Sequence, residues 1–325
     1  MANAIYSNAR AKYQENFLLG KERLLRLIES ESISEAYKVL SEVNFAGGAF
    51  GAEDDFENVI RLDEERFFAF VKETCPSNAL KEYLFIANDY HNAESFMRAK
   101  HLKIDADKLC VSSGLIDREK LKEKIFADNY KELRPLLSNA LSVAEEKFSA
   151  SCRSGAEISL IFKKALYEDL YQISLKDPIL KEIFSARADG ANVSLALRTR
   201  DYKWCKDRFV KGGTLNDAEL KVLCVEPKET LKDKIKNFKT KANVFLAVEE
   251  FISGSALLEF ERVNQSVAVK ILKAKKYQQS GIVPFMNYCF MKLAEYFNVR
   301  IILSGIINGH DKADIKRRLR ESYEG

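Results

Sequence analysis

An acidic residue followed three positions later by an asparagine occurs at three widely separated places in the sequence. The pairs are Asp89 with Asn92, Asp189 with Asn192, and Glu295 with Asn298. On a helix, residues three apart share one face, so each pair presents a carboxylate beside an amide. Three such pairs could converge on a shared axis and bind a polar ligand. Alternatively, each pair could order its own group of helices through hydrogen bonds to neighbouring backbone, and the threefold recurrence favours this structural interpretation.

The sequence lacks the common motifs of nucleotide, metal and hydrolase chemistry. It contains no GxxxxGK[ST] phosphate loop, no GxGxxG, no HExxH and no GxSxG. Its three histidines, His91, His101 and His310, are too few and too scattered to form a metal site without distant help. The six cysteines have no metal-ligand or CxxC spacing, so we expect reduced, mostly buried thiols: Cys75, Cys110, Cys152, Cys205, Cys224 and Cys289. We therefore expect no catalytic residue, no cofactor and no metal.

Each acidic–asparagine pair is followed by a glycine and then by a helix start. The glycines are Gly114, Gly213 and Gly309, and the expected helix caps are Asp117, Asn216 and Asp311. At an N-cap, a side-chain oxygen accepts a hydrogen bond from a free backbone N–H of the first turn. The acidic–asparagine pair and the glycine followed by a helix cap occur in the same order three times. This recurrence predicts internal repeats around residues 59–130, 158–235 and 244–325.

Composition and periodicity predict an all-helical fold. Only 14 glycines and 5 prolines occur in 325 residues, too few for the frequent turns of a β sandwich or barrel. Long helices are expected at 63–74, 158–175 and 244–276, before each pair. The sequence from Ser32 to Glu35 indicates a helix start, and residues 44–55 a loop. Phe285, Cys289, Leu293, Phe297 and Ile301 recur every four residues and predict one apolar stripe.

Basic residues after two of the pairs and near the C-terminus are candidate interface residues. The net charge of +4 is small, which favours a surface of mixed charge rather than a nucleic-acid-binding one. A solvated helix face would explain such clusters, and a partner or an anionic lipid surface is the alternative. The candidates are Arg98, Lys100, Arg198, Arg200, Lys316, Arg317, Arg318 and Arg320. No segment is apolar for long enough to span a membrane, so any role at a membrane is expected to be peripheral.

The C-terminal segment resembles the signature of the C subunit of V-type and archaeal A-type ATPases, a relative of the eukaryotic d subunit. The resemblance rests on a tyrosine in the helix, then a glutamate, then Asn-apolar-Arg-Ile, and an Arg-rich capped helix. Those positions are Tyr288, Glu295, Asn298 to Ile301, and the run to Arg320. The N-terminus is similar as well, at Tyr6, Ala9, Arg10, Leu18 and Leu19. The sequence departs from the family at Asn264, where an acidic residue is usual.

This resemblance implies a funnel-shaped body of three similar helical bundles without catalytic residues. Such a protein sits on the cytoplasmic face of the membrane-embedded proteolipid ring and receives the tip of the central shaft, made of the D and F subunits. It turns with them and transmits torque between ATP hydrolysis or synthesis and the transport of H⁺ or Na⁺. One copy per complex, a monomer in isolation and no nucleic-acid partner are implied. The alternatives are a helical scaffold of another complex, including an RNA-associated one, and an unrecognised enzyme.

Overall fold

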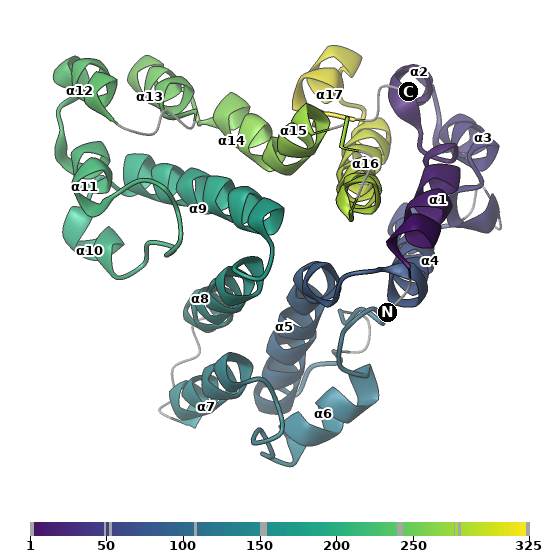
Figure 1. Ribbon diagram of the computed structural model, residues 1–325, viewed down its shortest axis with the longest axis horizontal. Coiled ribbons are helices and arrows are strands. Elements are labelled where there is room, and N and C mark those ends of the chain that lie inside the picture. Colours follow the sequence, from purple (N-terminus) through teal and green to yellow (C-terminus); the bar gives the residue numbers. More distant parts are fainter. Residues whose placement is uncertain are drawn as a thin grey trace. The chain divides into compact units, whose positions relative to one another are not determined.

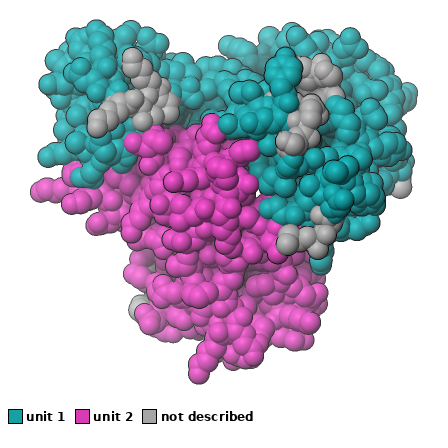
Figure 2. Space-filling view, viewed as in Figure 1, with its two compact units in different colours: residues 1–77, 196–200, 215–325 teal, residues 78–195, 201–214 magenta. Residues whose placement is uncertain are grey.

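Helices make up most of the described residues in the computed structural model (Figure 1). The structure describes residues 3–48, 50–51, 54–106, 109–149, 155–238, 243–275, 277–278 and 281–322. None of these residues lies in a β strand, so the predicted all-helical class is confirmed. The chain divides into two units, coloured separately in Figure 2. Unit 1 contains residues 1–77, 196–200 and 215–325, and unit 2 contains residues 78–195 and 201–214.

Unit 1 is built from both ends of the chain. From the first segment come α1 (Ala4–Glu15), α2 (Gly20–Glu29), α3 (Ile33–Glu42), the 3-10 turn η1 (Phe45–Gly48) and α4 (Phe56–Thr74). From the last segment come α11 (Asp217–Val225), α12 (Lys228–Lys234), the 3-10 turn η2 (Ile235–Asn237), α13 (Val244–Ser253), α14 (Leu258–Gln265), α15 (Val267–Ala274), α16 (Val283–Ile307) and α17 (Lys312–Arg318).

Helix α16 is the centre of unit 1. It packs against α1, α2, α3, α4, α15 and α17. Burial therefore extends around most of the helix, and the predicted single stripe is only partly right. Phe285 and Cys289 are buried, but Phe297 is 48% exposed. The guanidinium of Arg320 lies 3.7 Å from the centre of the Phe297 ring and covers part of it.

Unit 2 is formed mainly by α5 (Asn78–Leu102) and the helices that pack on it. These are α6 (Arg118–Phe126), α7 (Pro135–Ser149) and α8 (Gly155–Ser174). Helix α9 (Pro178–Thr199) belongs to unit 2 up to residue 195, and the short α10 (Tyr202–Lys206) follows it. The long α5 and α9 carry the first two acidic–asparagine pairs, and α16 carries the third.

The expected helix over residues 244–276 is wrong, because the chain breaks there into α13, α14 and α15. Gly254 ends α13 with a φ of 79°, a left-handed conformation that glycine adopts without a steric penalty. Leu257 precedes α14 with a φ of 57°. The other two expected helices are present within α4 and α8. Ser32 caps α3 as predicted, and its side chain accepts from the N–H of Glu35 at 3.3 Å.

Candidate functional site

Each asparagine of the three pairs holds the backbone of a residue farther along the chain. Its amide nitrogen donates to the C=O of that residue, and its amide oxygen accepts from the N–H of the same residue. The pairs are Asn92 with Val111, Asn192 with Val210, and Asn298 with Arg320, with distances from 2.8 to 3.1 Å. All three asparagines are at most 2% exposed. We call each of these bonded pairs a clamp.

The aspartates of the first two pairs lie against the glycines that follow them. Oδ1 of Asp89 accepts from the N–H of Ile116 at 3.1 Å, and Oδ1 of Asp189 accepts from the N–H of Thr214 at 2.8 Å. A Cβ on Gly114 or on Gly213 would lie 2.3 Å from the same Oδ1 atom. Glycine is therefore required at both positions because the carboxylate occupies the space of a side chain.

The third pair is organised differently. Glu295 accepts from the N–H of Leu19 at 2.6 Å and pairs with Lys292 at 2.6 Å, rather than with the Gly309 turn. Gly309 has a φ of 65°, and a Cβ there would meet nothing within 4 Å. The expectation that Gly309 marks the same turn as Gly114 and Gly213 is therefore wrong, because Gly309 follows the end of α16 in a left-handed conformation.

A buried ion cluster joins α16 to α4. Nζ of Lys292 lies 2.8 Å from Oδ2 of Asp63 and 2.6 Å from Oε1 of Glu295. Asp63 also accepts from the hydroxyl of Tyr296 at 2.9 Å and from the N–H of Ala46 at 2.7 Å. Each of the three charged residues is at most 7% exposed. The cluster thus connects α4, η1 and α16, and through Leu19 it reaches the start of α2.

The electrostatics of the cluster favour a charged lysine. Burial opposes the charge of Lys292, but the carboxylates of Glu295 and Asp63 raise its pKa above the ordinary value for lysine. Burial raises the pKa of Glu295, and Lys292 acts in the opposite direction. Burial also raises the pKa of Tyr296, so its hydroxyl remains a hydrogen-bond donor to Asp63. A buried pair with such complete hydrogen bonding fixes the geometry of the helices that carry it.

A related arrangement occurs in unit 2. The hydroxyl of Tyr90 on α5 donates to Oδ2 of Asp169 on α8 at 2.8 Å. Arg134 pairs with the same carboxylate at 3.1 Å, and Asp169 is 5% exposed. Tyr90 and Tyr296 each precede a clamp asparagine by two positions.

Sequence reasoning missed both of these networks. A tyrosine two residues before an asparagine was the available signal, together with isolated charges in apolar stretches, such as Asp63 between Ile60 and Phe67.

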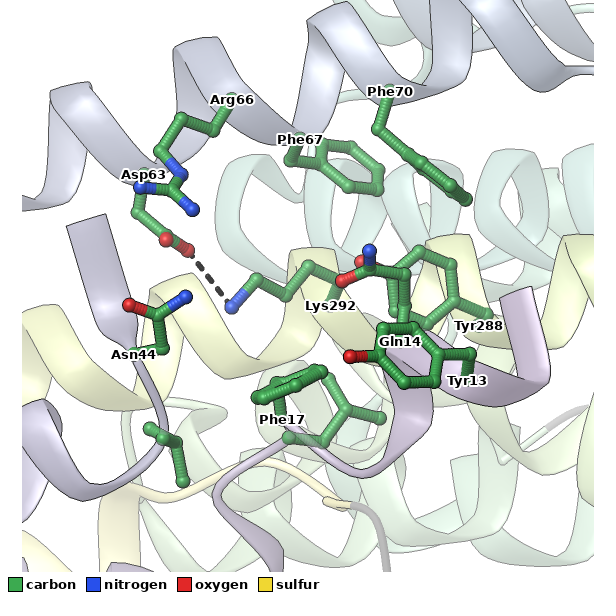
Figure 3. Close-up of a pocket in the computed structure, with 12 residues that line it drawn as sticks. Tyr13, Gln14, Phe17, Asn44, Asp63, Arg66, Phe67, Phe70, Tyr288 and Lys292 are labelled. Atoms are coloured by element: carbon green, nitrogen blue, oxygen red, sulfur yellow. Dashed lines mark ion pairs between the residues drawn. The ribbon is translucent and has the colours of Figure 1, made fainter. Parts of the chain in front are cut away.

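A cavity of about 220 Å³ lies beside the ion cluster in unit 1, between α1 and α4 with α16 at its base (Figure 3). Aromatic rings make up much of its wall, and Lys292 lies at its base. The aromatic lining residues are Tyr13, Phe17, Phe67, Phe70 and Tyr288. Arg66 and Gln14 also border it. The cavity was not anticipated from the sequence, because its residues come from four separate segments.

The three expected caps lie at helix N-termini. Asp117 accepts from the N–H of Lys120 at the start of α6, and Asp311 accepts from that of Ala313 at the start of α17. Asn216 forms a reciprocal capping box with Glu219 at the start of α11. These side chains satisfy backbone N–H groups that lack partners within their helices.

The basic residues that follow the first two clamp asparagines have internal partners. Arg98 pairs with Glu94 at 2.6 Å, and Lys100 with Glu145 at 3.0 Å. Arg198 pairs with Glu261 at 2.7 Å. Arg200 donates to the C=O of Leu223 at 2.5 Å, also donates to the C=O of Glu226, and lies over the ring of Phe251. Arg98, Lys100 and Arg200 are half-buried, whereas Arg198 remains exposed beside Glu261.

The basic residues near the C-terminus differ in their exposure. Lys316, Arg317 and Arg318 are exposed on α17, and Arg317 pairs with Asp314. Arg320 instead folds inward, donates to Oε1 of Gln265 at 2.7 Å and covers Phe297. Burial lowers the pKa of the Arg320 guanidinium to about 10. Only the first three of these residues form an exposed basic surface, which we call the α17 basic surface.

The remaining candidate groups are structural. Cys75, Cys110, Cys205, Cys224 and Cys289 are buried thiols, as expected, and Cys152 lies outside the described residues. Among the residues with described positions, no three His, Cys, Asp or Glu side chains are grouped to hold a metal ion. Within the same part of the chain, no helix has both the length and the apolar character needed to cross a bilayer.

Comparison with known proteins gives a match along almost the entire chain. The family model of the ATP synthase (C/AC39) subunit matches residues 7–318. The C subunit of the V-type sodium ATPase of Enterococcus hirae is 19% identical over 333 aligned positions, which cover 98% of each chain. The family match extends over both units and includes the first two clamps and Asn298 of the third, whose partner Arg320 lies just beyond it. The chain therefore belongs to the ATP synthase (C/AC39) subunit family, which comprises the C and d subunits of V-type and A-type ATPases.

Proposed function

We propose that this protein is a non-catalytic rotor subunit of a V-type or A-type rotary ATPase. It connects the central shaft, made of the D and F subunits, to the proteolipid ring, and it transmits torque between ATP hydrolysis or synthesis and ion transport. One copy lies at the cytoplasmic face of the membrane in each complex. The observation that carries this proposal is the family match over residues 7–318, which leaves little of the chain for another role.

Rigidity of the helices supports a role in transmitting torque. A load applied to α16 passes to α4 through Lys292 and Asp63, and to the N-terminal helices through the bond from Leu19 to Glu295. These bonds join buried groups of unit 1, and protein interiors have low compressibility and transmit strain. The three clamps also support the proposal that the body consists of three similar bundles around residues 59–130, 158–235 and 244–325.

The α17 basic surface is our candidate for one of the two interfaces. Lys316, Arg317 and Arg318 are consecutive and all exposed. Among the other basic candidates only Arg198 is exposed, and it pairs with Glu261. Exposed charge steers the association of two proteins and favours contacts that can dissociate and form again. An acidic patch on the shaft or the ring is the complementary surface.

Reconstitution tests the proposal. The purified chain is mixed with a D–F shaft and with detergent-solubilised proteolipid ring, separately and together, and the products are separated by size. We expect one copy in a complex that contains both partners, and ATP-driven ion transport in vesicles only when the chain is present.

Two results would contradict the proposal. One is failure to bind either partner while the chain remains folded. The other is ATP hydrolysis by the chain alone.

A further inference from the structure

The two aspartate contacts in unit 2 differ in the residue that follows the glycine and in the backbone N–H that donates, which belongs to the second residue after Gly114 but to the first after Gly213. Asp189 receives two hydrogen bonds from Thr214, one from its N–H at 2.8 Å to Oδ1 and one from its hydroxyl to Oδ2. In the first contact, the residue that follows the glycine is Leu115 rather than a threonine. Oδ1 of Asp89 accepts from the N–H of Ile116, but Oδ2 has no hydrogen-bond partner.

Oδ2 of Asp89 is enclosed as well as unpartnered. The residue is 1% exposed, and the atom has almost no contact with solvent. A buried carboxylate oxygen without a donor carries a large desolvation penalty when it is charged. A proton on Oδ2 removes this charge and leaves Oδ1 as the acceptor for Ile116.

The charged groups around Asp89 do little to offset this penalty. Arg134, from the turn before α7, is the nearby charge that favours the ionised form, but it is paired with Asp169 of α8 and with Glu82 of α5. From the segment leading to α6, the backbone N–H groups of Leu115 and Ile116 act in the same direction. The net effect is that burial raises the pKa of Asp89 to about 7.

We propose that the contact between Asp89 and residues 114–116 is a pH-dependent latch, closed when Asp89 is protonated and loosened when it ionises. The matching contact of Asp189 with residues 213–214 stays closed as pH increases, because the Thr214 hydroxyl supplies a second hydrogen-bond donor. The device lies within unit 2 and does not depend on the proposed function. It gives one of the segments that follow the long helices a sensitivity to proton concentration near neutrality.

The direction of the effect follows from linkage. In the open state Asp89 is solvated and has an ordinary carboxyl pKa, whereas the closed state raises it. A raised pKa in the closed state means that closure is favoured at low pH and is lost as pH increases through the range between the two values. The equilibrium constant for opening then increases by up to about tenfold per pH unit in that range.

Hydrogen exchange on the whole chain measures how opening of the Asp89 contact depends on pH. The protection factor of the Ile116 N–H, corrected for the intrinsic pH dependence of exchange, is followed from about pH 5 to 8. We expect it to fall as pH increases in the wild-type chain, while the Thr214 N–H shows no such fall. The Val111 and Val210 N–H groups, held by the asparagine clamps, report whether unit 2 remains folded.

Exchanging the two side chains gives matched variants. Leu115→Thr supplies the missing hydroxyl and should remove most of the pH dependence at Ile116, whereas Thr214→Val should create it at residue 214. Asp89→Asn, which cannot ionise, should leave Ile116 protection independent of pH. If wild-type Ile116 protection is constant over this range, or if Leu115→Thr leaves its pH dependence unchanged while Val111 remains protected, the latch proposal is wrong.

Discussion

Lys292 of α16 and Asp63 of α4 form a buried ion pair of 2.8 Å. The residues are far apart in the sequence, and the pair connects the first part of the chain to its last long helix. Glu295 completes the cluster from the other side of Lys292. The single lysine is therefore the counter-ion that two carboxylates with little access to water share.

Replacing Lys292 with methionine should destabilise unit 1 by about 3–5 kcal/mol, because both carboxylates lose their counter-ion in a buried site. Urea unfolding near neutral pH measures the change. Lys21→Met on the exposed surface of α2 is the matched control and should change stability by less than about 0.5 kcal/mol. A similar stability for both variants would contradict the structural role of the cluster.

The Lys292→Met variant should also recover stability in acid. Burial raises the pKa of Glu295, and Lys292 opposes that increase, so removing the lysine raises the pKa further. A carboxyl with a raised pKa in the folded state binds its proton more tightly there than in the unfolded chain. Its contribution to stability is present at low pH and is lost as pH increases. The loss of unfolding free energy relative to wild type should be smaller near pH 5 than near pH 8, and an equal loss would count against this account.

Replacing a clamp asparagine with alanine should cost about 1–3 kcal/mol, because a buried N–H and a buried C=O each lose a partner. Asn298→Ala should also increase hydrogen exchange at the Arg320 N–H, which the asparagine side chain holds at 2.8 Å. Asn58→Ala on the exposed surface of α4 is the control. An unchanged exchange rate at Arg320 would show that the clamp does not hold this segment.

Gly213→Ala should destabilise the protein more than the same substitution at a glycine with open space around its Cβ position. The new Cβ would lie 2.3 Å from Oδ1 of Asp189, and overpacking of this kind costs about 1–3 kcal/mol in addition to the lost hydrogen bonds. Gly254→Ala has open space around its Cβ and should cost about 1–2 kcal/mol for its left-handed backbone alone. Thermal unfolding of the two variants compares these costs. A milder effect at Gly213 would be inconsistent with the close approach of Asp189.

Reversing the charge of Lys316, Arg317 and Arg318 together should weaken assembly with the shaft or the ring at least tenfold and leave the fold intact. Arg320 is left unchanged, because its guanidinium packs on Phe297. Size-exclusion binding at two salt concentrations provides the measurement. The control reverses the exposed Lys163, Lys164 and Lys181, which gives the same change in net charge. Equal binding by both variants would show that the α17 basic surface is not an interface.

The sequence was sufficient to predict the helical class, the three acidic–asparagine pairs and the helix caps, but not the buried networks around Lys292 and Tyr90. The three pairs were recognisable because their spacing recurs, and the caps because they follow local rules. The partners of the pairs could not be predicted. Asn298 is bonded to a residue in an extended stretch after α17, and Glu295 to Leu19, 276 residues away. Such contacts depend on tertiary packing, which local periodicity does not encode.

The roles of the basic residues were also beyond sequence reasoning. Arg98 and Arg317 look alike as charges near helix ends, yet the first is held by Glu94 and Ser159 and the second is exposed. The break between α13 and α14 was missed because Gly254 lies in an otherwise apolar helical pattern. Glycine in such a pattern signals either a tolerated interruption or a helix end, and the sequence alone does not distinguish the two.

The composition of unit 1 from both ends of the chain constrains how the protein is made. During synthesis, α1 to α4 leave the ribosome long before α16. Asp63 therefore lacks its hydrogen-bond donor Tyr296, which lies 233 residues later, until α16 has emerged. Unit 2 has its main helices in one continuous stretch and can fold in the meantime. Until α16 emerges, the apolar surfaces of the N-terminal helices lack their main partner. Nascent chains stalled before residue 283 should therefore bind chaperones through this region and be cleaved by proteases there, while residues 78–195 resist cleavage.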